Sequence, residues 1–340
     1  MNQVSRSFAL VVPFLETPLN HWIATAYLIC RVVDNIEDCT RSVEWKAERF
    51  EELHELLAHP EKAHRVLSGW EQASWDGLTE SETAMMGVAG GLPLWQIYSQ
   101  IPDSARQGIG RWAGEMARGM LSVQDPNDEP HFVEHNGVLM LQREQDYDRY
   151  CYYVAGTVGR MSTELVVDHY GLEEDTSSLL FKDCEACGRA LQKTNIVKDF
   201  AEDLARGVSF LPDEWLQRSG YSPLQLTGAS PDWKMMVLDN VLKELRESVH
   251  YLMALPFRAK GYRMASLMCL LPAYQTLLLA AKQQHILFTE QHHVKISKLT
   301  MAQCAKDAHR MLYDNEAIDR YSRSIESEIG AKLSVSAMQV

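Results

Sequence analysis

The chain has 340 residues, a hydrophobic fraction of 46% and a formal net charge of −13 at pH 7. This length and composition allow a substantial buried core. The negative charge argues against broad electrostatic binding of nucleic acid, because such binding needs lysine and arginine to neutralise phosphates. It does not exclude an anionic substrate, since bound metal ions reverse the sign of the charge locally.

Helical patterns dominate the chain, alternating strand-like runs are nearly absent, and Gly and Pro gather at segment ends. We predict helical segments at 5–14, from Pro18 to Asp38, and at 43–57, 94–100, 109–122, 146–170, 183–203, 232–253, 262–284 and 301–329. A loop or surface helix is expected at 68–82, a break at 90–93, and loops at 125–130, 206–212 and 219–231. No linker divides the chain, so we predict one all-α domain over residues 1–340.

The seven cysteines are odd in number and lie mostly in apolar helical context, which fits free thiols in a reducing compartment. Cys184 and Cys187 form a C-x-x-C pair, but no second pair or nearby His completes a zinc site, so we interpret them as helix-packing residues.

The first residues lack the charged and then apolar pattern of a secretory leader. The most apolar window, 266–281, falls short of the roughly 20 residues that a membrane span needs. We therefore predict a buried core helix there and a cytoplasmic protein, either soluble or peripheral to a membrane.

The segment 27–38 is an apolar helical stretch that ends in three acids. Asp34, Glu37 and Asp38 lie at i, i+3 and i+4, so a helix places all three on one face. Their like charges repel, and a bound cation relieves that repulsion. Carboxylate oxygens suit Mg²⁺, which keeps several waters and completes its shell with substrate phosphate oxygens. The alternative interpretation is a solvated helix face.

The same D-x-x-E-D spacing recurs 165 residues later, from position 34 to position 199, in Asp199, Glu202 and Asp203. This second triad also ends an apolar helical run. Two identical triads suggest two walls of one cavity. A diphosphate bridged by Mg²⁺ ions is the natural occupant, because the metals neutralise the phosphate charge and make it a leaving group.

Further motifs accompany the two triads in a fixed order along the chain: 2–8, 27–38, 148–159, 191–203, 210–212 and 294–298. Together these stretches resemble the squalene/phytoene synthase family, and within it the bacterial type of the squalene-forming branch. The resemblance implies an isoprenoid synthase fold, a single large helical bundle around a central apolar cavity. It also implies that the two aspartate-rich motifs face each other at the mouth of that cavity.

The resemblance further implies a prenyltransferase that condenses two farnesyl diphosphates head to head. The first loses diphosphate, and the double bond of the second attacks the allylic cation, which gives the cyclopropane presqualene diphosphate. A second ionisation, a rearrangement and a hydride from NADPH, or from NADH, then give squalene. Relatives that stop at dehydrosqualene, presqualene diphosphate or hydroxysqualene are the alternative. A non-catalytic scaffold of the same fold is a third hypothesis, which the two complete triads disfavour.

Carried over residue by residue, the resemblance assigns metal binding to both triads, with Asp34, Asp38, Asp199 and Asp203 also catalytic. It assigns substrate binding to Ser5, Arg6, Ser7, Arg31, Gln192 and Asn195. A plain salt bridge to Asp34 is the alternative role of Arg31, and N-capping is compatible with the role of the two serines.

Two tyrosines, Tyr27 and Tyr150, match family tyrosines near the reacting carbons. Aromatic faces stabilise a carbocation without acting as nucleophiles, and an apolar pocket keeps water from it. Tyr150 is the better candidate to take the proton when the cyclopropane closes.

The resemblance assigns Asn195, Lys295 and Lys298 to the nicotinamide cofactor. Ser297 stands where the family usually has Arg, which leaves the choice between NADPH and NADH open. On charge alone, the two lysines are an ordinary surface pair. No G-x-G-x-x-G follows a strand, so a Rossmann site is excluded. Eukaryotic members carry a C-terminal membrane anchor, whereas this sequence ends in a polar helix and a short tail at 333–340, which fits either a bacterial enzyme or a shortened chain. A peripheral membrane contact for product release is compatible with both interpretations.

Overall fold

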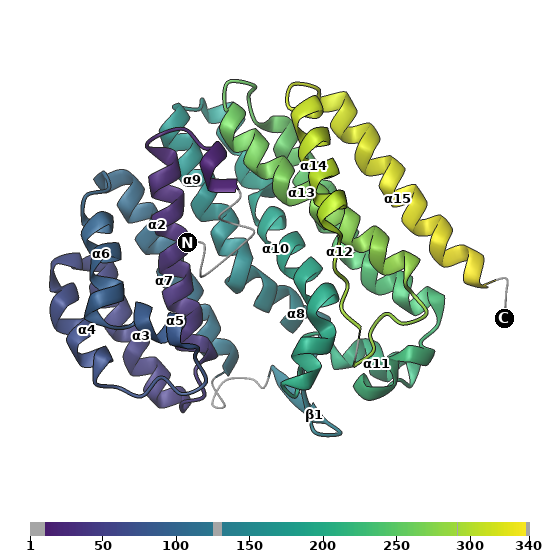
Figure 1. The fold of residues 1–340 in the computed structure, drawn as a ribbon, viewed down its shortest axis with the longest axis horizontal. Coiled ribbons are helices and arrows are strands. Elements are labelled where there is room, and N and C mark those ends of the chain that lie inside the picture. The colour runs from purple at the N-terminus through teal and green to yellow at the C-terminus, as the bar shows by residue number, and fades with distance from the viewer. Residues whose placement is uncertain (1–10, 125–130, 291, 338–340) are drawn as a thin grey trace. The chain divides into compact units, whose positions relative to one another are not determined.

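The computed structural model describes residues 11–124, 131–290 and 292–337 (Figure 1). It is 77% helical and 3% strand, which confirms the all-α class. By their contacts, the residues form two compact units. The first comprises Met1–Asp128 and Thr157–Ser177, and the second comprises Glu129–Gly156 and Ser178–Val340. We call them unit 1 and unit 2. The expectation of one domain over 1–340 stays a prediction.

Unit 1 is built around two long helices that pack against each other, α2 and α7. Its helices are α2 (Leu19–Asp38), α3 (Val43–Ala58), α4 (Ala63–Glu71), α5 (Glu80–Met85), α6 (Val88–Ser99), α7 (Asp103–Gln124) and α9 (Thr157–Tyr170). Helix α2 starts after Pro18 and buries Ile29, Val33 and Ile36 completely. Because these three positions share one helix face, the acids at the C-terminal end of α2 lie on its flank.

Unit 2 surrounds α13, which packs against α12, α14 and α15. Its helices are α8 (Glu144–Cys151), most of α10 (Glu174–Ala205), α11 (Asp213–Ser219), α12 (Pro231–Ala254), α13 (Lys260–Lys282), α14 (Lys298–Met311) and α15 (Asn315–Ala337). Helix α13 is, among the helices described, the one long and apolar enough to cross a membrane, and 67% of its most apolar window is buried. The buried core helix predicted at 266–281 is therefore confirmed.

A small sheet in unit 2 was not predicted. Strands β1 (Phe132–His135) and β2 (Val138–Leu141) form an antiparallel hairpin, and β3 (Val208–Ser209) pairs in parallel with β2. The loop predicted at 206–212 is therefore wrong in part. Strands of two to four residues are too short to carry a periodic signal.

The break predicted at 90–93 is also wrong, because α6 runs from Val88 to Ser99 with Pro93 inside it. The two glycines serve close packing instead of ending a segment. A Cβ at Gly90 would lie 2.1 Å from the carbonyl oxygen of Ala84 at the end of α5. The glycine therefore permits a backbone approach that any side chain would prevent.

Two helices that the pattern joins are interrupted in the structure. The helix predicted at 146–170 consists of α8, a π-helical turn at Tyr152–Gly156, and α9. Helix α10 comes so close to this turn that a Cβ at Gly188 would lie 1.8 Å from the oxygen of Ala155. The helix predicted at 301–329 divides into α14 and α15, because Asp314 caps α15 by accepting the N–H of Ala317 at 2.8 Å.

All seven cysteines are free, and five of them are buried, as predicted for packing residues. Burial raises the pKa of the Cys187 thiol well above its usual range. A thiol held neutral in this way is a poor nucleophile and a poor metal ligand.

Candidate functional site

The first acidic motif lies at the C-terminal end of α2, in unit 1. Asp34 accepts a hydrogen bond from Arg31, with 3.0 Å between Nη1 and Oδ2. Burial raises the pKa of Asp34 to about 7, against the opposing charge of Arg31, and the carboxylate of Asp38 raises it further. The side chain keeps 22% of its surface exposed, so Asp34 is desolvated and still reachable. The salt bridge of Arg31 to Asp34, which the sequence analysis gave as the alternative role of this arginine, is observed, and its binding of phosphate stays a prediction.

The second acid of this motif, Glu37, is enclosed by polar partners that the sequence did not reveal. Gln124, the last residue of α7, donates to Glu37 Oε1. Lys46 of α3 is only 8% exposed, and its Nζ donates to the backbone oxygen of Glu37 at 2.5 Å and to Gln124 Oε1 at 2.9 Å. Burial, followed by the charge of Asp38, raises the pKa of Glu37 to about 8. Asp34 and Glu37 are therefore not fully solvated, contrary to the alternative interpretation of this motif.

Glu82 of α5 is a further residue that sequence reasoning missed. It accepts from Arg31 Nη2 at 2.9 Å, so one guanidinium joins Asp34 and Glu82. Thr79 and Glu82 also form a capping box at the start of α5. The T-x-x-E spacing is visible in the sequence as a helix start, but its link to Arg31 is not.

The second acidic motif lies near the C-terminal end of α10, in unit 2. Asp199 pairs with Lys198 at 2.8 Å. Glu202 is 64% exposed and pairs with His293 Nδ1 at 3.4 Å. Asp203 is buried, and this burial raises its pKa although the neighbouring Arg206 donates to it.

The two predicted tyrosines lie in different units, Tyr27 on α2 and Tyr150 on α8. Tyr27 is half-buried. Tyr150 is 9% exposed and stacks on Phe210, with ring centroids 4.7 Å apart and planes 15° apart. Phe210, from the motif at 210–212, therefore adds a second aromatic face beside Tyr150, a contact that the sequence did not indicate.

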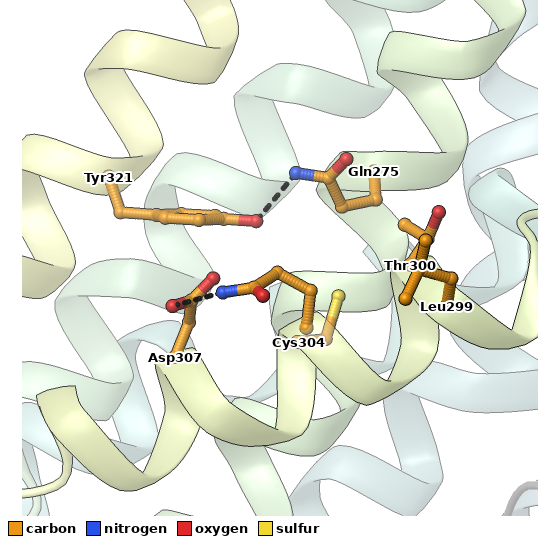
Figure 2. A pocket seen from close by; sticks show the side chains of 7 residues that line it. Gln275, Leu299, Thr300, Cys304, Asp307 and Tyr321 are labelled. Carbon is orange, nitrogen blue, oxygen red and sulfur yellow. Dashed lines mark hydrogen bonds between the residues drawn. The ribbon is translucent and has the colours of Figure 1, made fainter.

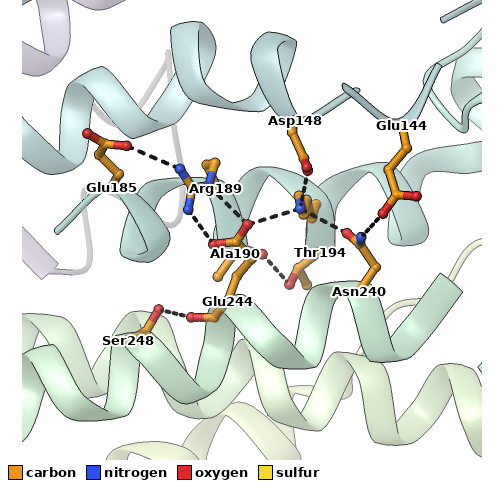
Figure 3. A network of polar contacts seen from close by, with 10 residues as sticks. Glu144, Asp148, Glu185, Arg189, Ala190, Thr194, Asn240, Glu244 and Ser248 are labelled. Atoms are coloured by element: carbon orange, nitrogen blue, oxygen red, sulfur yellow. Dashed lines mark hydrogen bonds and ion pairs between the residues drawn. The ribbon is translucent and has the colours of Figure 1, made fainter. Parts of the chain in front are cut away.

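A buried polar network joins α8, α10 and α12 in unit 2 (Figure 3). At its centre, Lys193 is 1% exposed. Its ammonium donates to Asp148 at 2.6 Å, to Asn240 at 2.8 Å and to Glu244 at 3.0 Å. Arg189 reaches both oxygens of Glu244, at 3.0 and 2.9 Å. All three ammonium hydrogens of Lys193 are thus satisfied, which stabilises a buried charge.

On the same stretch of α10, Gln192 is half-buried and Asn195 is exposed. The segment 294–298 leads into α14, where the Ser297 hydroxyl accepts the N–H of Thr300 at 3.0 Å. Lys295 and Lys298 are both exposed.

The connection between α13 and α14 touches the second acidic motif. Phe288 packs edge-on against Phe200 at 5.3 Å, and His293 pairs with Glu202. These contacts come from residues just before the predicted cofactor segment 294–298, and this segment and the second triad both belong to unit 2.

A pocket of about 360 Å³ lies between α13, α14 and α15 (Figure 2). The hydrogen bond from Gln275 to Tyr321 crosses it at 2.7 Å, and Leu299 at its rim is 80% exposed. None of the residues predicted for the site lines this pocket.

Within the described ranges, no three His, Cys, Asp or Glu side chains are grouped as a metal site. Mg²⁺ commonly takes only one or two protein carboxylates and fills its shell with water and substrate phosphates. The metal assignments of both triads stay predictions. Ser5, Arg6 and Ser7 lie outside the described residues.

The family model described as "Squalene/phytoene synthase" matches residues 1–300 of the chain. The squalene synthase of Eremothecium gossypii is 33% identical over 220 residues, which are 63% of this chain and 45% of that protein. The squalene synthase of Saccharomyces cerevisiae is 29% identical over 98% of this chain and 71% of its own length. The chain thus aligns with less than half of the first of these relatives.

A solved structure of a protein named TcSQS, with the ligand BPH1237, has a TM-score of 0.75. It is 21% identical and covers 97% of this chain and 89% of its own. The likeness shows the fold, which is the isoprenoid synthase fold that the motifs implied.

Proposed function

This chain belongs to the squalene/phytoene synthase family, and we propose that it joins two farnesyl diphosphates head to head to presqualene diphosphate and then reduces this product to squalene. The observation that carries the proposal is the pair of complete D-x-x-E-D triads, one on α2 and one on α10. A scaffold protein has no need for six such acids, two of which are held partly desolvated at Asp34 and Glu37.

The donor set of the triads fits Mg²⁺. All six groups are carboxylates, the hard oxygen ligands that this ion prefers, and the residues that would hold it are Asp34, Glu37, Asp38, Asp199, Glu202 and Asp203. The raised pKa values of Asp34 and Glu37 mean that their protein partners do not fully offset the desolvation of their charge. When bound, Mg²⁺ supplies the positive charge that lets diphosphate leave.

The side chains of the protein do the remaining work of the first half-reaction. Arg31 offers a fixed guanidinium to the diphosphate, in a geometry suited to phosphate oxygens. Tyr150 and Phe210 present stacked aromatic rings to a developing cation. We assign to Tyr150 the proton that is lost when the cyclopropane closes, and the released diphosphate is its final acceptor.

The residues for the reductive step fit a phosphorylated nicotinamide cofactor. Lys295 and Lys298 are exposed cations, and Lys298 begins α14, whose N-terminus favours anions. Asn195 is exposed on α10, so its amide is accessible to a ligand. When bound, NADPH supplies the hydride that completes squalene.

The test is incubation of the purified chain with farnesyl diphosphate and Mg²⁺, with and without NADPH, followed by identification of the products. Squalene formed only with NADPH supports the full proposal. A product that is the same in both reactions assigns the chain to relatives that lack the reductive step. No condensation product at all contradicts the proposal.

Lys295→Ala is expected to raise the NADPH concentration for half-maximal squalene formation by about tenfold, the size of one lost charge-assisted hydrogen bond. Presqualene diphosphate or dehydrosqualene should accumulate at low NADPH. Lys306→Ala, an exposed lysine on α14, is the matched control. A normal squalene yield at low NADPH would show that the segment does not bind the cofactor.

The stability of the metal-free protein is expected to fall as the pH rises from about 4 to about 8. Asp34 and Glu37 have folded-state pKa values of about 7 and about 8. Unfolded Asp and Glu titrate near 4, so between these values the folded state binds more protons, and raising the pH favours unfolding. Mg²⁺ should restore stability mainly at the alkaline end, because it binds the ionised carboxylates.

Thermal unfolding with EDTA and with Mg²⁺ across this pH range measures the effect. The same Mg²⁺-induced rise in Tm at acidic and alkaline pH would contradict the link between the carboxylates and the cation.

A further inference from the structure

A fourth carboxylate, Glu82, reaches the first acidic motif through a shared arginine. The guanidinium of Arg31 donates from Nη1 to Asp34 Oδ2 at 3.0 Å and from Nη2 to Glu82 Oε1 at 2.9 Å. The side chains of Arg31 and Glu82 are 21% and 25% exposed. The ion pair is therefore partly shielded from solvent. Charge pairs that are shielded in this way interact more strongly than pairs on an open surface.

Glu82 is not itself placed as a cation ligand, because both of its oxygens are engaged. Oε1 accepts from Arg31, and Oε2 accepts from the N–H of Thr79 at 2.9 Å and from its hydroxyl at 2.8 Å. Burial opposes ionisation, but the hydrogen bonds from Thr79 and the charge of Arg31 outweigh it and lower the pKa of Glu82. Glu82 thus stays negative at neutral pH.

Asp34 differs from Glu82 in this respect. Its Oδ2 accepts from Arg31, whereas Oδ1 has no hydrogen-bond partner among the residues that the structure describes. The Asp34 carboxylate can therefore bind a cation, provided that a second anion pairs with Arg31 in its place.

We propose that Glu82 is a positioning residue that keeps Arg31 beside the motif and so frees Asp34 for a divalent cation. The inference rests on the proposed function, since it concerns the cation that this function requires. Without the charge of Glu82, Arg31 pairs with Asp34 alone and competes with the cation. The negative potential at the motif also falls. Both effects weaken cation binding, so the expected direction is unambiguous.

A purely structural role predicts something else. If the ion pair only fastens α5 to α2, its loss lowers the stability and leaves cation affinity unchanged. Glu82→Gln separates the two roles, because Gln at this position still serves a capping box. The variant removes the charge and keeps the start of α5. Glu80→Gln, an exposed acid two residues earlier on the same helix, is the matched control.

The experiment is a titration of the full chain with Mn²⁺, as a stand-in for Mg²⁺, followed by electron paramagnetic resonance of the free ion under argon. All proteins are titrated at the same pH of about 8.5, on the alkaline side of the raised pKa values of Asp34 and Glu37. Glu82→Gln is expected to weaken Mn²⁺ binding about tenfold, as partners that orient metal ligands commonly do. Glu80→Gln should bind Mn²⁺ like the wild type. A lower metal-free Tm of Glu82→Gln is compatible with the proposal, because this variant also loses its ion pair with Arg31.

Each other outcome has a distinct meaning. Equal Mn²⁺ affinity in the two variants, with or without a lower Tm for Glu82→Gln, overturns the role of Glu82 and leaves the proposed function standing. If the wild type does not bind Mn²⁺, alone or with inorganic pyrophosphate, the cation site of the proposed function fails, and the inference fails with it.

Discussion

Replacing either Asp34 or Asp199 by Asn is expected to lower the turnover of farnesyl diphosphate about a thousandfold or more, which in practice abolishes it. The fold should stay intact. Asn keeps the size of the side chain and removes the charge that a cation needs. A loss of this size is typical when one group that stabilises developing charge is removed. Asp34 lies in unit 1 and Asp199 in unit 2, so the two variants test the two triads separately.

The measurements are product formation with Mg²⁺ in excess, circular dichroism and Tm. Asp175→Asn is the control, because Asp175 is an exposed acid in the first turn of α10. Near-normal turnover in either variant would contradict the metal assignment of that triad. A collapsed circular dichroism spectrum would instead show that the acid serves the fold.

Lys193→Met is expected to destabilise the protein by about 3 kcal/mol, because removing one partner from a buried charge network leaves other charges unpaired. The ammonium of Lys193 holds Asp148, Asn240 and Glu244 together at 2.6–3.0 Å. We expect the lower end of the usual range of effects. Asp148 keeps 49% of its side chain exposed and can rehydrate, and Arg189 still neutralises Glu244.

Urea unfolding of the variant and of Lys182→Met gives the comparison. Lys182 is exposed on the same helix, so its replacement should change the midpoint little. A midpoint for Lys193→Met equal to that of the control would mean that the network contributes no net stability. The same variant also tests whether the network helps to hold α8 in place, because Asp148 lies on that helix, two residues before Tyr150.

Helices with a clear apolar face were predictable from the sequence, because their periodicity is local. Helix α3 begins at Val43 as predicted, and α2 ends with its acids at Asp38. The errors occur where a distant segment changes a local preference. Gly90 was interpreted as part of a break, but it packs closely against α5. The π-helical turn at Tyr152–Gly156 lies against Gly188 of α10.

The two triads, their identical spacing and the family motifs are determined by the sequence alone, because side-chain order and helical spacing need no tertiary information. From them follows the expectation of a diphosphate substrate, and the all-α class follows from the helical periodicity along the chain. The sequence also contains Glu82, Lys46, Gln124 and Lys193, but it does not say what they contact.

Only the tertiary structure decided those contacts. Arg31 meets Glu82 across 51 positions, and Glu37 meets Gln124 across 87. Pairing between residues so far apart in the sequence depends on how whole helices pack, and no local sequence pattern encodes it. The same packing desolvates Asp34 and Glu37 and raises their pKa values. The sequence shows which acids are present, and the fold sets the charge that they carry and the partners that hold them.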